Sequence, residues 1–166
     1  MPNILYKNVT VNNPFTQIPF NNQDNYKLDL TNSMQFGPLN SVRVSGIFRD
    51  GRIAGLLMKH LVSGVFNNMD LNFREDAAFD VSNSKYGTSY EIRVITKHGT
   101  STCPSYMIGA GRTYNEAEHV VKLKNIDYFI FVDITQSPTF KLFPVLSTNK
   151  LLWKKITYKQ FYNKII

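Results

Sequence analysis

One short segment restricts the fold of this chain more than any other: residues 127–133, which read Asp-Tyr-Phe-Ile-Phe-Val-Asp. Between its two acids every side chain is apolar or aromatic, so the segment lacks the polar and apolar alternation of a strand with one wet face. Such a run is typical of a central strand that is buried on both faces. Other elements must therefore cover the sheet from both sides.

A buried helix is predicted for residues 50–66. Within them apolar side chains recur at every fourth position: Ile53, Leu57, Leu61 and Val65. That spacing places them on one face of a helix. Asp50 is suited to cap its first turn. We expect His60, which lies inside the segment, to pack or form hydrogen bonds rather than to bind a metal ion.

The rest of the chain predicts shorter elements. Two strands joined by a turn are expected over 74–81 and 89–96, and a loop over 97–114. Asn115 can cap a helix that runs to about Leu123. Residues 140–146 are expected to pair with 127–133, and 149–164 to form one or two helices. This order of elements implies an α/β fold with a mixed central β-sheet flanked by helices.

The length of 166 residues fits one domain. We divide it into an N-terminal arm (1–40) made of loops with room for one short strand, a core (50–146), and basic C-terminal helices (147–166). No long apolar run and no leader-like N-terminus is seen, so a soluble, cytoplasmic protein without membrane contact is expected. The single cysteine, Cys103, allows no internal disulfide and is interpreted as a packing residue.

Positive charge points to a polyanionic partner. The net charge is +7 and the isoelectric point is about 9.5, which favours nucleic acid first and an anionic membrane surface second. From Lys141 to Lys164, both included, there are six lysines and no acid. This C-terminal stretch is either a phosphate-contacting surface or simply a solvated face.

Two acids and one base form the most informative group of residues. Asp80 precedes Glu91-Ile92-Arg93 by about ten positions. If 89–96 is a strand, Glu91 and Arg93 project from the same face, because side chains alternate with a period of two. Asp80 can reach that face from the end of the preceding strand. Two carboxylates meeting there suit Mg²⁺, and a neighbouring cation suits the charge that develops when a phosphodiester is hydrolysed.

The segment from Phe79-Asp80 through Tyr86-Gly87-Thr88-Ser89-Tyr90-Glu91-Ile92-Arg93 resembles the PD-(D/E)xK nuclease signature. The resemblance covers 50–146 and is nearest to small type II restriction endonucleases. It implies a restriction endonuclease-like fold and Mg²⁺-dependent cutting of double-stranded DNA at a short specific sequence by a homodimer. It also implies catalytic roles for Asp80, Glu91 and Arg93, with Mg²⁺ held by the two acids.

Two positions depart from that signature. Phe79 stands where some members have proline, which matters little. Arg93 replaces the usual lysine, and a guanidinium stays protonated where an amine can release its proton. Arg93 can still neutralise phosphate charge, but it cannot act as a base. Altered or lost activity therefore stays open.

The loop after the motif is predicted to contact DNA, because it is short of acids and rich in groups that bind phosphates and base edges. The resemblance implies the same, since it assigns base reading to this loop. For a homodimer, we expect the 50–66 helix or the N-terminal arm to form the contact between the two copies. Gly109 and Gly111 would let the main chain approach DNA. The predicted DNA contacts are Lys97, His98, Ser101, Thr102, Ser105, Tyr106 and Arg112.

Three alternatives remain open at this level. Asp80 and Glu91 could instead form a structural salt bridge with Arg93 or Lys85. The protein could be a repair or junction-resolving nuclease of the same fold, or a basic DNA-binding protein without catalysis. Three other acids have less certain roles in the sequence. Glu75 and Asp76 are interpreted either as an additional metal contact or as solvated side chains, and Asp133 is interpreted as structural.

Overall fold

Strand β6 (Tyr128–Asp133) occupies the interior of the sheet, as its apolar sequence predicts. Ile130 and Val132 enter the core on one face, and Phe129 and Phe131 enter the core on the other. All four side chains are fully buried. The computed structural model describes residues 3–34, 37–39, 41–48, 51–74 and 78–165.

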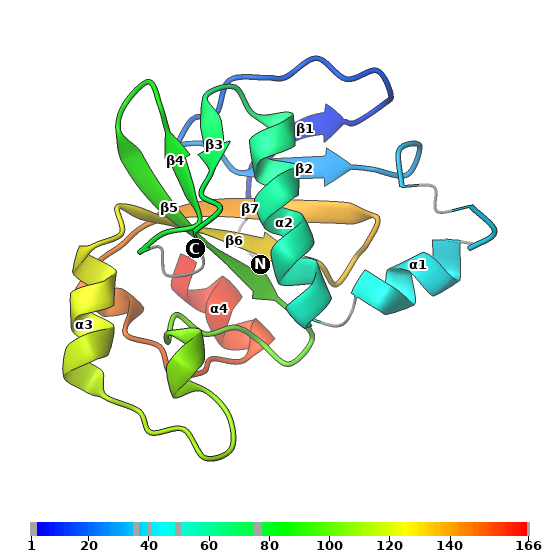
Figure 1. The fold of residues 1–166 in the computed structure, drawn as a ribbon. Coiled ribbons are helices and arrows are strands. Elements are labelled where there is room, and N and C mark those ends of the chain that lie inside the picture. Colours follow the sequence, from blue (N-terminus) through cyan, green and yellow to red (C-terminus); the bar gives the residue numbers. More distant parts are fainter. Residues whose placement is uncertain (1–2, 35–36, 40, 49–50, 75–77, 166) are drawn as a thin grey trace.

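Seven strands of the described residues form one mixed sheet in the order β1-β2-β7-β6-β5-β4-β3 (Figure 1). The other strands are β1 (Lys7–Thr10), β2 (Tyr26–Asp29), β3 (Met69–Leu71), β4 (Val81–Asn83), β5 (Thr88–Ile95) and β7 (Thr139–Leu146). The pairs β1–β2 and β5–β6 are parallel, and the other neighbours are antiparallel.

Helices cover both faces of this sheet. They are α1 (Ser41–Phe48), α2 (Gly51–Val65), α3 (Glu116–Lys124) and α4 (Tyr158–Ile165), with short 3₁₀ helices η1 (Ser105–Met107) and η2 (Asn149–Leu151). Helix α2 packs on one face through Ala54, Met58 and Val62. Helices α3 and α4 contribute Leu123 and Phe161 to the core on the opposite face. The predicted α/β class with a helix-flanked mixed sheet is confirmed.

The positions of helices α2 and α3 also agree with their predictions. Helix α2 matches the prediction for 50–66 to within one residue at each end, although Asp50 itself lies outside the described residues. Asn115 caps α3, and its side chain accepts a hydrogen bond from the main-chain N–H of Glu118 at 3.2 Å. His60 is exposed on α2, with its ring edge-on to Phe73 at 6.5 Å between centroids.

The N-terminal region differs from its prediction. Residues 1–40 contain two strands, and β2 pairs with β7, so this region extends the sheet. Tyr26 and Leu28 alternate into the core, but a four-residue strand is too short to show this period convincingly in sequence. Helix α1 and strand β3 were not predicted. The segment 149–164 holds η2 and α4 with irregular chain between them.

The two strands of the hairpin that carries the motif differ in length. Strand β4 has three residues and starts at Val81, whereas the prediction placed a strand over 74–81; β5 has eight residues. As a result β4 pairs only with Thr88 to Tyr90 of β5. Beyond Tyr90 the outer edge of β5 has no strand partner from β4. Among the described residues, no helix is long and apolar enough to cross a membrane.

Candidate active site

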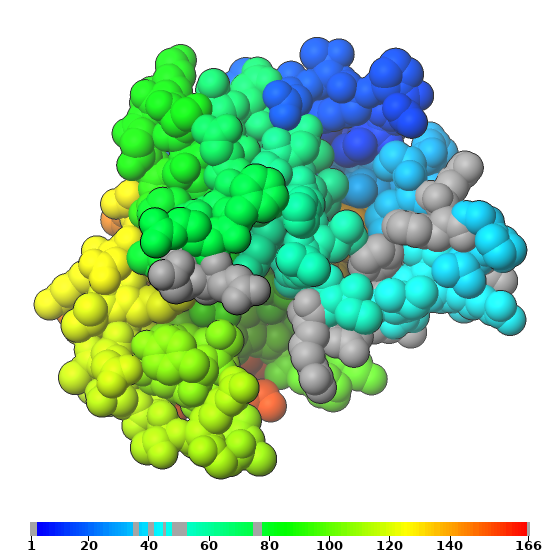
Figure 2. Space-filling model, in the orientation of Figure 1, coloured from blue at the N-terminus to red at the C-terminus, as the bar shows by residue number. Residues whose placement is uncertain are grey.

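A cleft of about 630 Å³ opens beside the start of β4. In Figure 2 it lies between α2 and the loop that precedes α3. Its walls come from α2, from the second half of β5, from the loop after β5 and from α3. The charged residues that line it are Lys59, Asp80, Glu91, Arg93 and Lys122. The predicted catalytic trio therefore lines one common cleft.

Asp80 is fixed in place by the unpaired edge of β5. Its main-chain N–H donates to the carbonyl of Tyr90 at 2.9 Å. Its carboxylate accepts the N–H of Ile92 at Oδ2, also at 2.9 Å, and so satisfies a donor that a longer β4 would have paired. Tyr90 and Ile92 are the two neighbours of Glu91. The acid at position 80 is thereby held beside the acid at position 91.

Lys59 of α2 is the cationic partner of Asp80. Its Nζ lies 2.7 Å from Asp80 Oδ1. The structural alternative with Lys85 does not occur, because the ammonium of Lys85 lies over the ring of Tyr86. Both oxygens of Asp80 are thus engaged, one by a main-chain N–H and one by a lysine.

Glu91 and Arg93 project from the same face of β5, as the period of two predicted. Glu91 Oε1 lies 3.0 Å from a guanidinium nitrogen of Arg93. The same oxygen lies 3.1 Å from Nζ of Lys122, which reaches down from α3. Both ion pairs use Oε1.

Burial dominates the charge state of Glu91, whose residue is only 5% exposed. Removal from water raises the pKa of its carboxyl, and the negative charge of Asp80 raises it further; Arg93 and Lys122 act in the opposite direction. The influence of Asp80 means that the two carboxyls interact electrostatically. A divalent cation between them would relieve this repulsion, whereas protons compete for Glu91 as the pH falls.

Two polar atoms in the cleft are buried without a partner among the described residues. They are Nε of Arg93 and Oγ1 of Thr100. Arg93 also donates from its Nη2 to the carbonyl of Cys103 at 3.2 Å, which ties the strand to the following loop. Buried donors without partners are rare in folded proteins. A phosphate oxygen is a suitable acceptor for both.

The donor set fits Mg²⁺. This ion is usually bound by one or two carboxylates and keeps several waters for itself and for substrate phosphates. Asp80 and Glu91 supply two carboxylates, and no third His, Cys, Asp or Glu of the described chain gathers with them. Glu75 and Asp76, which were considered as an additional metal contact, lie outside the described residues.

The residues predicted to bind DNA are spread over the surface near this cleft. Ser101 and Ser105 line the cleft itself. Lys97 and His98 line a smaller hollow together with Thr96 and Thr135.

Two of the predicted contacts are exposed but partly engaged within the protein. The hydroxyl of Tyr106 donates to Glu118 at 3.4 Å. Arg112 donates to the carbonyls of Ser105 and Ile108. Each could keep contacts to a ligand on its exposed side.

Thr102 is the exception among the predicted DNA contacts. Its side chain is fully buried, its hydroxyl donates to the carbonyl of Leu151, and it accepts the N–H of Trp153 at 3.1 Å. The ring of His119 lies 3.1 Å from the same hydroxyl. Thr102 joins the loop to η2 and α3, so its side chain is not available to DNA. The sequence gave no sign of that role, because Thr102 belongs to the continuous hydroxyl run Thr100-Ser101-Thr102.

Sequence reasoning also missed two cations of the site, Lys59 and Lys122. Each is far from the acids along the chain and reaches them only because α2 and α3 pack on the sheet. A weak signal exists for Lys122, which directly precedes the buried Leu123 and follows the buried His119 by one turn. The sequence alone did not show that this part of α3 lies over Glu91.

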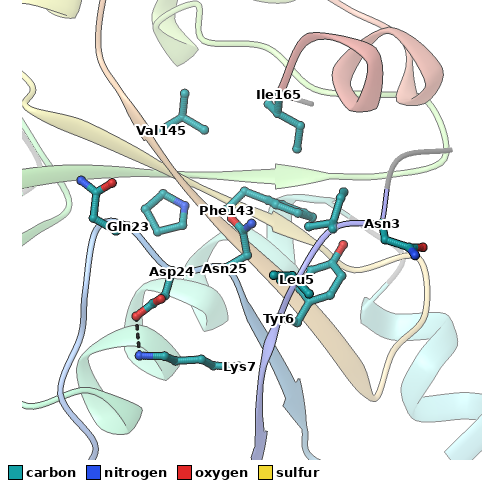
Figure 3. Close-up of a pocket in the computed structure, with 12 residues that line it drawn as sticks. Asn3, Leu5, Tyr6, Lys7, Gln23, Asp24, Asn25, Phe143, Val145 and Ile165 are labelled. Atoms are coloured by element: carbon teal, nitrogen blue, oxygen red, sulfur yellow. Dashed lines mark ion pairs between the residues drawn. The ribbon is translucent and has the colours of Figure 1, made fainter.

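Another hollow, of about 520 Å³, lies between the N-terminal segment and β7 (Figure 3). Its one carboxylate, Asp24, is already paired with Lys7 at 2.5 Å. A single paired acid is a weaker site for a divalent ion than the two in the cleft. Asp133 is buried and accepts hydrogen bonds from Tyr158, Tyr162 and Thr135, in keeping with a structural role.

Comparison with family models, with curated proteins and with solved structures finds no match to this chain. Any functional assignment therefore depends on the residues of the cleft.

Proposed function

We propose that this protein is a Mg²⁺-dependent endonuclease of the PD-(D/E)xK type, with the restriction endonuclease-like fold, that cuts double-stranded DNA at a specific short sequence. The observation that carries the proposal is the meeting of Asp80 and Glu91 in one cleft beside Arg93. The order of elements around them supports it as well. Helix α2 precedes the motif, the β4–β5 hairpin holds the acids, and a long polar loop follows.

Each residue of the cleft has a role in this chemistry. Asp80 and Glu91 would hold the metal ion, which when bound lowers the pKa of water and offsets phosphate charge. Arg93 carries a permanent positive charge, and its buried Nε has no partner in the part of the chain that the structure describes, so it is suited to bind the scissile phosphate. Ser101 and Ser105 lie on the cleft wall where a DNA backbone would pass.

The direct test is digestion of plasmid DNA in Mg²⁺ and in EDTA. Wild-type protein should give discrete fragments in Mg²⁺ and none in EDTA. Asp80→Asn and Glu91→Gln keep the size of each side chain but remove its charge, so each should lower the cleavage rate by at least about 100-fold through loss of the metal. DNA binding, measured by fluorescence anisotropy in EDTA, should change little.

Asp70→Asn is the matched control, because Asp70 is an exposed acid on β3 outside the cleft. It should cut like the wild type. Full activity in both cleft variants would refute the proposal. Cutting confined to branched DNA would instead indicate a repair or junction-resolving nuclease of the same fold.

A second function has one observation in its favour. In the absence of a metal ion, Lys59, Arg93 and Lys122 already neutralise the two acids, which is also how a purely structural cluster is arranged. A basic DNA-binding protein without catalysis would bind DNA in this assay and would cut nothing in Mg²⁺.

A further inference from the structure

Two hollows beside β7 share part of their lining and form one groove, which we call the β7 groove. The hollow of about 520 Å³ described above (Figure 3) adjoins a second one of about 790 Å³. Four residues line both of them: Gln23, Pro144, Val145 and Ile165. Of the described residues, none lines both this groove and the candidate active-site cleft. The β7 groove is therefore a second concave surface of the protein.

The β7 groove carries an excess of positive charge. Lys7, Lys150 and Lys164 line it. Among the described residues its one carboxylate is Asp24, which pairs with Lys7 at 2.5 Å. Lys150 and Lys164 are exposed, and neither forms an ion pair with an acid of the described chain. Two lysine charges are thus left for an anionic ligand, whereas the lysines of the cleft are both paired.

Amide side chains add hydrogen-bonding groups along the same groove. They are Asn3, Asn22, Gln23 and Asn25. Gln23 is exposed, and its side chain has no hydrogen-bond partner in the described part of the chain. Asn22 accepts the hydroxyl of Tyr90 at Oδ1, at 2.8 Å, and this bond leaves its NH₂ group unused. An amide offers both a donor and an acceptor, as the edges of nucleic-acid bases do.

The remaining lining of the groove is largely apolar where it follows β7, at Phe143, Pro144, Val145 and Leu146. Lysines suit phosphates, amides suit base edges, and an apolar floor suits the faces of unpaired bases. A duplex keeps its base faces stacked inside, so it would use the lysines alone. An anionic membrane is flat and cannot enter a hollow. The combination favours a single nucleic-acid strand.

We propose that the β7 groove binds a single strand of nucleic acid, with Lys150 and Lys164 on its phosphates and Gln23 on a base edge. The proposal does not depend on the nuclease function, because it uses a different surface of the protein. It also gives two lysines of the basic C-terminal stretch a phosphate-contacting role. The sequence alone left that stretch as either a phosphate-contacting surface or a solvated face.

The test measures binding of a short fluorescein-labelled DNA strand by fluorescence anisotropy, in EDTA so that no metal-dependent cleavage occurs. Lys150→Gln combined with Lys164→Gln should weaken binding at least about tenfold at low salt, because two phosphate contacts are lost. The slope of log affinity against log salt should become shallower by about 1.4, since each phosphate contact to a single strand contributes about 0.7. The matching duplex should lose less than about twofold in the same variant, because its base faces cannot enter the groove.

Two further variants separate the groove from the overall charge. Lys85→Gln combined with Lys124→Gln is the matched control, because it removes the same charge from two exposed lysines that line neither the groove nor the cleft. It should bind the strand within about twofold of the wild type. Gln23→Glu keeps the size of the side chain but places a negative charge in both hollows, so it should weaken strand binding by about tenfold.

Strand binding that is unchanged in the groove variants, or weakened as much in the control, would overturn the proposal. Equal losses for the strand and the duplex would show a surface for phosphates in general and would refute the single-strand assignment. Unchanged strand binding together with lost binding to vesicles of equal parts phosphatidylserine and phosphatidylcholine would assign the groove to a membrane surface instead.

Discussion

At the scale of single residues, the cleft contains more basic than acidic side chains. Two acids face three bases, and the buried Glu91 accepts two of them at one oxygen. Burial alone would favour the neutral form of Glu91, so its partners are what make a carboxylate tolerable there. Under the proposed function, a cleft with this excess of positive charge would attract phosphate, and its acids would become metal ligands once a cation displaces the lysines.

His119 allows a prediction about pH. Burial lowers the pKa of its imidazole, and its ring nitrogens contact Thr102 and Tyr114. The unfolded chain takes up a proton below about pH 6.5, whereas the folded chain resists it. Stability contributed by neutral His119 should therefore be present at pH 7.5 and decline towards pH 5.5, with a slope of at most about 1.4 kcal/mol per pH unit.

Urea denaturation of the wild type and of His119→Gln at both pH values checks this. The variant should lose less stability on acidification than the wild type does. The raised pKa of Glu91 acts in the opposite direction in both proteins, because a folded state that favours a proton gains stability as the pH falls. Equal losses in the two proteins would contradict the effect ascribed to His119.

At the scale of elements, the shortness of β4 creates the site. Because β4 begins only at Val81, the N–H of Ile92 is left for the carboxylate of Asp80, and the cleft opens at that point. A continuous apolar run predicted β6, and periodicity predicted α2 and the shared face of Glu91 and Arg93, since these patterns are local. It could not predict Lys59, Lys122 or the burial of Thr102, because their positions depend on how distant segments pack.

Helix α3, which carries His119 and Lys122, is capped at its first turn by Asn115, and we expect this cap to contribute to the stability of the protein. Asn115→Ala removes the cap that accepts the N–H of Glu118 and should lower the free energy of unfolding by about 1 kcal/mol. Asn115→Asp retains a cap oxygen and serves as control. Urea denaturation at pH 7.5 measures both. A loss as large in the Asp variant as in the Ala variant would show that the cap does not account for it.

At the scale of the whole molecule, the nuclease proposal requires two active sites to cut both strands, and two copies of one chain supply them most simply. The sequence placed the dimer contact on α2 or on the N-terminal arm. Exposed apolar side chains of α1 and α2 surround a largely apolar groove, and Leu56 lines both this groove and the cleft. We therefore expect a second copy to bind at this groove.

Light scattering should therefore give a mass of twice 19.1 kDa for the wild type. Ile53→Glu puts a charge into the exposed apolar face of α2 and should yield the monomer. Val121→Glu, at an exposed position on α3, should remain dimeric. A wild type that is monomeric both alone and on DNA would rule out this arrangement.

The central claim is that the carboxylates of residues 80 and 91 together bind a divalent ion. Isothermal titration of Mn²⁺ into wild type, Asp80→Asn and Glu91→Gln tests it without any assumption about the substrate. The wild type should bind one ion per chain, and each variant should lose this binding. Binding that is absent from the wild type, or unchanged in both variants, would contradict it.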